Sequence, residues 1–145
     1  MSLFSAISVS ASGMEAQRTR AELLVENLAN SETTRTAEGG PYRRKDAVFQ
    51  TDAPESPFHS VFAAQLSEQN QGVAVSEITV DTRDPEKRYQ PGHPDADKDG
   101  YVAMPRINPA EDMVDLIGAS RTYQANVAAI SAVKDMIQRS IDLFR

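Results

Sequence analysis

The sequence has no cysteine and only two histidines, His59 and His93. Without cysteine the chain can form no disulfide framework, thiolate zinc site or cysteine nucleophile. It also lacks a phosphate-cradling glycine loop, a nucleophile elbow and an HExxH zinc motif. We therefore expect no catalytic residue, no metal ligand and no cofactor, and predict that the protein is not an enzyme.

Long apolar runs are missing as well. No stretch approaches the ~18 to 20 consecutive apolar residues that a membrane-spanning helix needs, so we expect no direct membrane insertion. Residues 1–13 contain neither a basic n-region nor a continuous apolar h-region, which argues against a cleaved secretory signal. If the protein leaves the cytoplasm, we expect a route that uses no cleavable leader.

Clustered positive charge is scarce, because the net charge is −6. Residues 46–108 contain 11 acidic and 5 basic groups, whereas the regions on either side are nearly neutral. Contacts to phosphates need grouped lysine and arginine, so nucleic acid is not an expected partner. The near-neutral ends could approach copies of themselves without strong repulsion.

Residues 3–29 are predicted to form an amphipathic helix. They contain no proline, and apolar side chains recur at helical spacing. Its first half is rich in serine and contains Gly13, which has low helix propensity, so this helix should depend on a partner. Asn30 is placed to end it. The apolar positions are Leu3, Ile7, Ala11, Met14, Ala21, Leu24, Val25 and Leu28.

Residues 109–145 contain the clearest element. Asn108 is a good N-cap, Pro109 fits the first helical position, and Glu111 follows three residues after the cap. An alternating three-four spacing continues to the end of the chain and predicts a coiled-coil seam. The seam positions are Met113, Leu116, Ser120, Tyr123, Val127, Ile130, Lys134, Ile137, Ile141 and Phe144.

The region between the helices contains seven prolines, and the six from Pro54 to Pro105 exclude a long helix. We expect extended loops with short strands at 47–49, 73–80 and 101–104. The apolar positions of 73–80 alternate in two phases, which is typical of a strand with a bulge. Residues 58–69 could instead form a short helix, while the conformation of 50–72 as a whole stays open.

The predicted fold is therefore mainly α with small β. Helices at 1–30 and 109–145 pair as a coiled-coil-like bundle, and 31–108 forms a loop-rich insertion with short strands. One pairing cannot bury all the apolar surface of such long helices, so we expect a homo- or hetero-oligomer. A monomeric helical hairpin is the simpler alternative. The expected assembly interface comprises Leu3, Ile7, Met14, Leu24, Leu28, Met113, Leu116, Tyr123, Val127, Ile130, Ile137, Ile141 and Phe144.

Two charged motifs allow other functions. Asp95, Asp97 and Asp99 alternate before Gly100, as in the opening of an EF-hand loop. Position 12 of that loop would be Arg106, and nearby prolines exclude flanking helices, so a solvated turn is favoured. A secreted calcium-binding interaction module remains the alternative function, and a carboxylate-dependent peptidoglycan hydrolase is a third. The basic stretch 43–45 could contact phosphate or a lipid head group, but a solvated or salt-bridged loop is favoured.

Four blocks follow one another along the chain, at 12–35, 39–49, 89–105 and 111–127. In this order they resemble the flagellar basal-body rod and hook family, and they match its proximal rod members best. The blocks span the whole chain. The chain differs from the usual pattern at Arg106, where the family more often has asparagine, and 50–72 matches no block. The motif residues are Asn27, Asn30 and Thr34; Gly40, Pro41 and Tyr42; Pro91, Gly92, His93, Pro94, Asp95, Gly100 and Tyr101; and Gln124 and Asn126.

The resemblance implies a structural protein exported unfolded by the flagellum's own type III apparatus. It would assemble in the periplasm into the rod that joins the membrane ring to the hook. Its expected partners are other rod proteins and the membrane-ring and export-gate base of the rod. The terminal helices would form the inner wall of the tube, with the central segment outside them.

Overall fold

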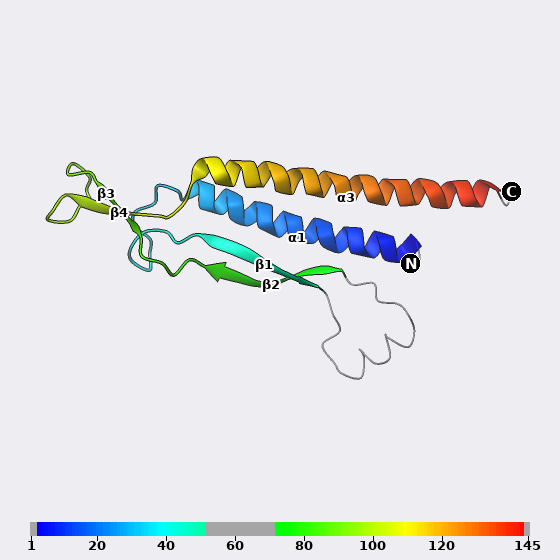
Figure 1. Cartoon of the computed structure of the whole chain (residues 1–145), viewed down its shortest axis with the longest axis horizontal. Helices are drawn as coiled ribbons and strands as arrows, with labels where there is room; N and C mark the ends of the chain where they lie inside the picture. Colours follow the sequence, from blue (N-terminus) through cyan, green and yellow to red (C-terminus); the bar gives the residue numbers. More distant parts are fainter. Residues whose placement is uncertain (1–2, 52–71, 144–145) are drawn as a thin grey trace, which may run out of the picture.

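The computed structural model describes residues 3–51 and 72–143. Two long helices lie side by side and antiparallel, and α1 separates α3 from the β1–β2 pair (Figure 1). The β3–β4 pair lies at the end of the molecule where α3 begins. The elements are α1 (Leu3–Ala29), β1 (Lys45–Thr51), β2 (Val73–Val80), β3 (Glu86–Tyr89), β4 (Tyr101–Met104) and α3 (Pro109–Leu143).

The expected mainly helical fold with small antiparallel strand pairs is therefore confirmed, whereas supercoiling of the helices remains a prediction. The short helix considered at 58–69, together with His59 and Phe144, lies outside the described residues. No helix within the described residues combines the length and the hydropathy that a membrane span would need.

Both helix boundaries follow from local capping. The side chain of Asn108 accepts a hydrogen bond from the Ala110 amide at 3.2 Å, which confirms the predicted N-cap. At the end of α1, the Asn30 side chain donates to the Glu26 carbonyl at 2.9 Å. The Asn30 amide also donates to this carbonyl at 3.1 Å, so Asn30 closes the last turn of α1 through both its backbone and its side chain.

The two helices approach each other closely at Gly13. A Cβ atom at this position would lie only 3.0 Å from the Asn126 side-chain nitrogen. Farther along the pair, the Arg20 guanidinium and the Asp115 carboxylate are 3.3 Å apart. Glycine is a poor helix former, but here its missing side chain lets α3 come close.

The buried face of α3 differs from the predicted seam at three positions. At each of them, the residue before the predicted one is buried. Asp112, Ala119 and Val133 are buried. Met113, Ser120 and Lys134, each one residue later, are exposed. The other series of the seam, which contains Leu116, Tyr123, Ile130 and Ile137, is half-buried except for Tyr123, which is 41% exposed. At the start of α3, the ion pair with Arg44 holds Asp112 inward, and Met113 at the next position is left exposed.

On α1, the helix predicted at 3–29 has the predicted bounds, but its apolar stripe is only partly covered. Leu24 is buried, whereas Ile7, Met14 and Leu28 are half-buried and Leu3 is 40% exposed. The remaining buried positions are smaller or polar, or lie off the stripe: Ser5, Ala16, Leu23 and Asn27.

The β1–β2 pair contains the predicted bulge. Val48 pairs with Glu77, but the next residue, Phe49, pairs with Val75. Ser76 is therefore the extra residue of β2, and the side-chain alternation changes phase there. The change of phase in the sequence was thus a correct signal.

The β3–β4 pair was only half predicted. β4 was expected, but β3 has the sequence EKRY and is exposed throughout, so it carries no apolar alternation. The Tyr89 and Tyr101 rings meet edge-on across the pair, with centroids 5.3 Å apart. Gly100 has a φ of 81°, and a Cβ there would lie 2.9 Å from the Tyr89 ring. Only glycine satisfies both conditions.

Candidate assembly surface and its supporting junction

Asn27 anchors the central segment to α1. It is fully buried, and its amide donates to the Lys45 carbonyl at 2.8 Å while its oxygen accepts from the Lys45 amide at 3.0 Å. The Tyr42 hydroxyl donates to the same oxygen at 3.1 Å. The side chain thus pairs with the first residue of β1 as a neighbouring strand would, which fixes where the strand begins.

Charged groups surround this anchor. The Lys45 ammonium forms an ion pair with Glu26 at 2.5 Å and lies 5.7 Å from the centre of the Tyr42 ring. Burial and the negative charge of Glu26 raise the pKa of Tyr42 to about 12. Tyr42 therefore stays protonated, and keeps its hydrogen bond to Asn27, over the whole physiological pH range.

A second anchor joins β1 to the start of α3. The Arg44 guanidinium lies 3.1 Å from the Asp112 carboxylate, whose side chain is fully buried. This is an ion pair without hydrogen-bond geometry, and no donor within the described ranges bonds either Asp112 oxygen. Burial raises the pKa of Asp112, which the charge of Arg44 partly offsets. Arg44 is shared with Asp46, whose carboxylate lies 3.2 Å away.

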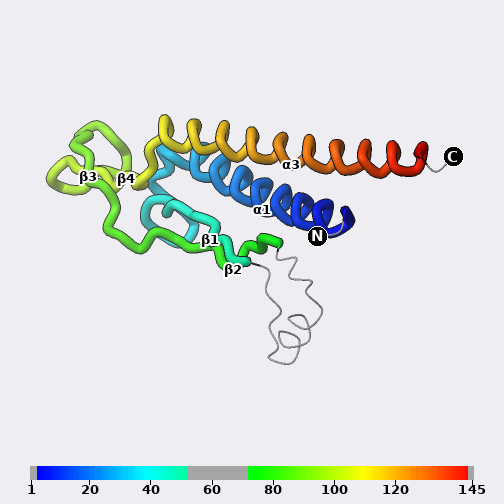
Figure 2. Tube along the Cα trace, turned by 45° about the vertical axis from the view of Figure 1, so that its right-hand side comes forward, coloured from blue at the N-terminus to red at the C-terminus, as the bar shows by residue number. Residues whose placement is uncertain are grey.

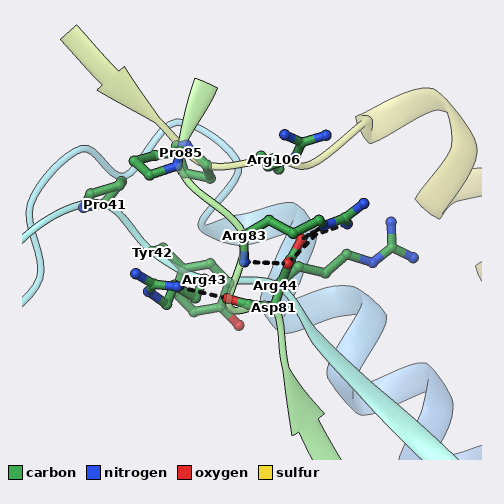
Figure 3. A pocket seen from close by; sticks show the side chains of 9 residues that line it. Pro41, Tyr42, Arg43, Arg44, Asp81, Arg83, Pro85 and Arg106 are labelled. Carbon is green, nitrogen blue, oxygen red and sulfur yellow. Dashed lines mark hydrogen bonds and ion pairs between the residues drawn. The ribbon is translucent and has the colours of Figure 1, made fainter. Parts of the chain in front are cut away.

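A small pocket of about 20 Å³ lies where the loops after β2 and β4 pass residues 41–44 (Figure 3). Arg83 bonds the Asp81 carboxylate through its side chain and its amide, and these bonds hold the pKa of Asp81 well below its usual range. The Arg43 guanidinium donates to the Asp81 carbonyl at 3.0 Å. Arg44 and Lys45 are ion-paired within the chain, while the exposed Arg43 bonds only a backbone carbonyl, as expected for a solvated or salt-bridged segment.

The acidic loop is organised by its own carboxylates. Asp97 accepts from the amides of Asp99 and Tyr101 at 2.9 and 2.8 Å, and Asp95 accepts from the Thr34 hydroxyl at 2.8 Å. His93 accepts from the Asp95 amide, which gives it the expected role in a turn. In the parts of the chain that the structure covers, no three acidic or histidine side chains converge as metal ligands. The geometry gives the calcium alternative no support.

These contacts bring the four sequence blocks together. Asn27 of the first block meets Tyr42 of the second, and Thr34 meets Asp95 of the third. Gly13 meets Asn126 of the fourth. Gln124 is exposed, while Gly40 has a positive φ of 78° in the turn before Pro41. The central anchors Arg44 and Asp112 were not singled out as site residues, because a charged residue in sequence gives no sign of burial.

Outside this junction, large apolar side chains remain exposed on both helices and on β2. Of the predicted interface residues, Met113, Tyr123, Val127 and Ile141 are 41 to 56% exposed. Further exposed positions on the helices that the predicted interface did not include are Phe4, Val9, Val25, Val114, Ile117, Met136 and Leu143. Single exposed apolar residues are ordinary, but this many along one helix pair indicate a contact surface.

The sequence matches known proteins over its whole length. The model of the flagellar basal body rod FlgEFG protein C-terminal family matches residues 98–143. A flagellar basal-body rod protein FlgC from Borreliella burgdorferi is 38% identical, covering 100% of this chain and 99% of the relative. FlgC proteins from Bacillus subtilis (39%) and Salmonella typhimurium (35%) cover 99% of this chain and 99% and 98% of their own lengths. By this identity, and by its four ordered motif blocks, the chain belongs to the FlgC family of flagellar basal-body rod proteins.

Proposed function

We propose that the protein is a structural subunit of the proximal flagellar rod, which transmits torque from the membrane ring towards the hook. It would do so by helical assembly with copies of itself and with other rod proteins. The junction around Asn27 and Arg44 would hold the central segment rigidly on the helix pair, so that force applied to one reaches the other.

The observation that carries this proposal is the exposed apolar surface of α3. Val127 is 42% exposed and Ile141 is 56% exposed, although both belong to a regular apolar series. Burying such side chains stabilises an interface by ~1.5 to 3 kcal/mol each. A monomeric hairpin would leave that gain unused, whereas a rod subunit would obtain it from its neighbours.

Substitutions test this directly. We expect Ile137→Asp to abolish incorporation into the rod, because it places an unpaired charge in an apolar contact. Ile137 is half-buried in the monomer, so Val127→Asp and Ile141→Asp separate assembly from folding. The readouts are swimming motility, the amount of subunit retained in purified basal bodies, and circular dichroism of the purified chain.

Ser131→Asp, at an exposed polar position of the same helix, is the matched control. Loss of motility in all three apolar variants, with normal circular dichroism for Val127→Asp and Ile141→Asp, is the expected result. Normal motility and incorporation of both exposed-site variants would refute the assembly role of this surface.

Export by the flagellar type III apparatus and residence in the periplasm belong to the same proposal. They are supported by the resemblance of the motif blocks to the rod and hook family. Export should therefore stop when the flagellar export apparatus is disabled and continue when the general secretory pathway is inhibited, as measured by the amount of subunit outside the cytoplasm.

A further inference from the structure

Asp112 is a buried carboxylate whose charge the chain balances only in part. Its side chain is fully buried, and neither of its oxygens accepts a hydrogen bond from the residues that the structure describes. The Arg44 guanidinium is paired with it at 3.1 Å, but without hydrogen-bond geometry. Removing a carboxylate from water is unfavourable unless hydrogen bonds and an opposite charge replace its hydration. Of these two, Asp112 has only the opposite charge.

That opposite charge is shared with a second carboxylate. The Nε atom of Arg44 donates to both oxygens of Asp46 at 3.2 Å. The Asp46 side chain is 55% exposed, so water can solvate its charge, whereas water does not reach Asp112. The hydrogen bonds of Arg44 therefore go to the carboxylate that needs them less, and the buried one keeps an uncompensated part of its charge.

The other charged groups near Asp112 add to this imbalance. Three further carboxylates repel its charge: Asp46, Glu111 and Asp115. The cation that α1 contributes, Arg20, is paired with Asp115 at 3.3 Å. Burial raises the pKa of Asp112, Arg44 lowers it only in part, and the three carboxylates raise it further. Burial, missing hydrogen bonds and neighbouring charges thus all favour the neutral acid.

We propose that Asp112 is a proton-binding switch in the contact between the start of α3 and the segment that leads into β1. These elements meet at the end of the helix pair where α1 ends (Figure 2). The charged carboxylate weakens the contact, and uptake of one proton strengthens it, while Arg44 stays bonded to Asp46 in both forms. The hydrogen bonds of Asn27 join uncharged groups, so the anchor of β1 on α1 does not follow this change. How firmly α3 is held thereby depends on the pH of the surrounding compartment.

Urea titrations of the purified full chain at pH 7 and pH 4 test the switch. Asp112→Leu keeps roughly the shape of the side chain and removes its charge, so at pH 7 it should raise the ratio of folded to unfolded chain about ten-fold. Because the pKa is raised on folding, the folded wild-type chain takes up the proton first as the pH falls, and it regains stability relative to the variant. The difference should shrink to less than about three-fold at pH 4. Glu111→Gln, which changes an exposed carboxylate in the same turn, is the matched control and should shift the ratio less than about three-fold at either pH.

Removal of the cation gives the second arm of the test. Arg44→Met leaves the buried carboxylate without any compensation, so the folded fraction at pH 7 should fall at least about ten-fold, and Asp112→Leu in the same chain should restore it. This rescue separates an effect of charge from a loss of packing by Arg44. Equal stability of the wild type and Asp112→Leu at pH 7, a difference that stays constant down to pH 4, or a double variant that remains unfolded would each overturn the proposal.

Discussion

The junction and the outer surface of the helix pair differ in which side chains they bury. The junction buries polar groups, whereas the outer surface exposes apolar ones. At the junction, polar side chains such as Asn27 and Asp112 are buried and paired within one chain. Along the helices, by contrast, apolar side chains such as Ile117 and Leu143 are exposed to solvent. Contacts within the single chain therefore fix the position of its central segment. Much of its helical surface, in contrast, stays available for contacts with other subunits.

Among the changes that test this comparison, Asn27→Ala should lower the stability of the chain most. It leaves the Lys45 amide and carbonyl and the Tyr42 hydroxyl without their partner. Since an unsatisfied buried group costs about 1 to 3 kcal/mol, we expect the free energy of unfolding to fall by about 3 kcal/mol in urea titrations. Gln124→Ala, at an exposed motif position, is the control and should change it by less than about 0.5 kcal/mol. Equal effects of both variants would mean that the junction has no special role.

Hydrogen exchange should sharpen the contrast in the dilute monomer. We expect amides in α3 beyond Met136 and in the serine-rich first turns of α1 to exchange about 100-fold faster than those of residues 23–27, because the ends have few buried contacts. The difference should disappear in assembled rods. Strong protection throughout both helices of the monomer would contradict the idea that their ends become ordered on assembly.

The smallest effect should appear at high pH. The folded-state pKa of Tyr42 is about 12, above the ordinary value of 10 in the unfolded chain. Its contribution to stability is therefore complete below pH 10 and is lost as the pH rises through 12. Relative to Tyr42→Phe, the wild-type protein should lose about 1 to 2 kcal/mol of unfolding free energy over this range. A constant difference between the two proteins from pH 8 to 11.5 would show that Tyr42 is not held in its neutral form.

Features with a local signal could be predicted from the sequence. The cap at Asn108 precedes a proline and an acidic turn, so the start of α3 followed from adjacent residues alone. The bulge at Ser76 followed from the change of phase within β2. The family motif likewise identified Asn27 and Tyr42, though not that their side chains bond each other.

Features that depend on distant residues could not be predicted in this way. β3 is a charged, exposed strand that exists because β4 pairs with it. The burial of Asp112 in place of Met113, which was predicted to face the partner helix, depends on the ion pair with the distant Arg44. Periodicity gives the repeat of a helix face, but the identity of the neighbour decides which residues of that repeat are covered.

The antiparallel arrangement of α1 and α3 also has a practical consequence. α1 begins and α3 ends at the same end of the molecule (Figure 1). The exposed Phe4 and Leu143 belong to these helix ends. An affinity tag or fluorescent protein fused to either terminus would thus crowd one and the same region. The β3–β4 pair lies at the opposite end of the molecule (Figure 1), so the exposed turn at Gly92 between its strands offers a site where a label can be inserted away from the exposed ends of the helices.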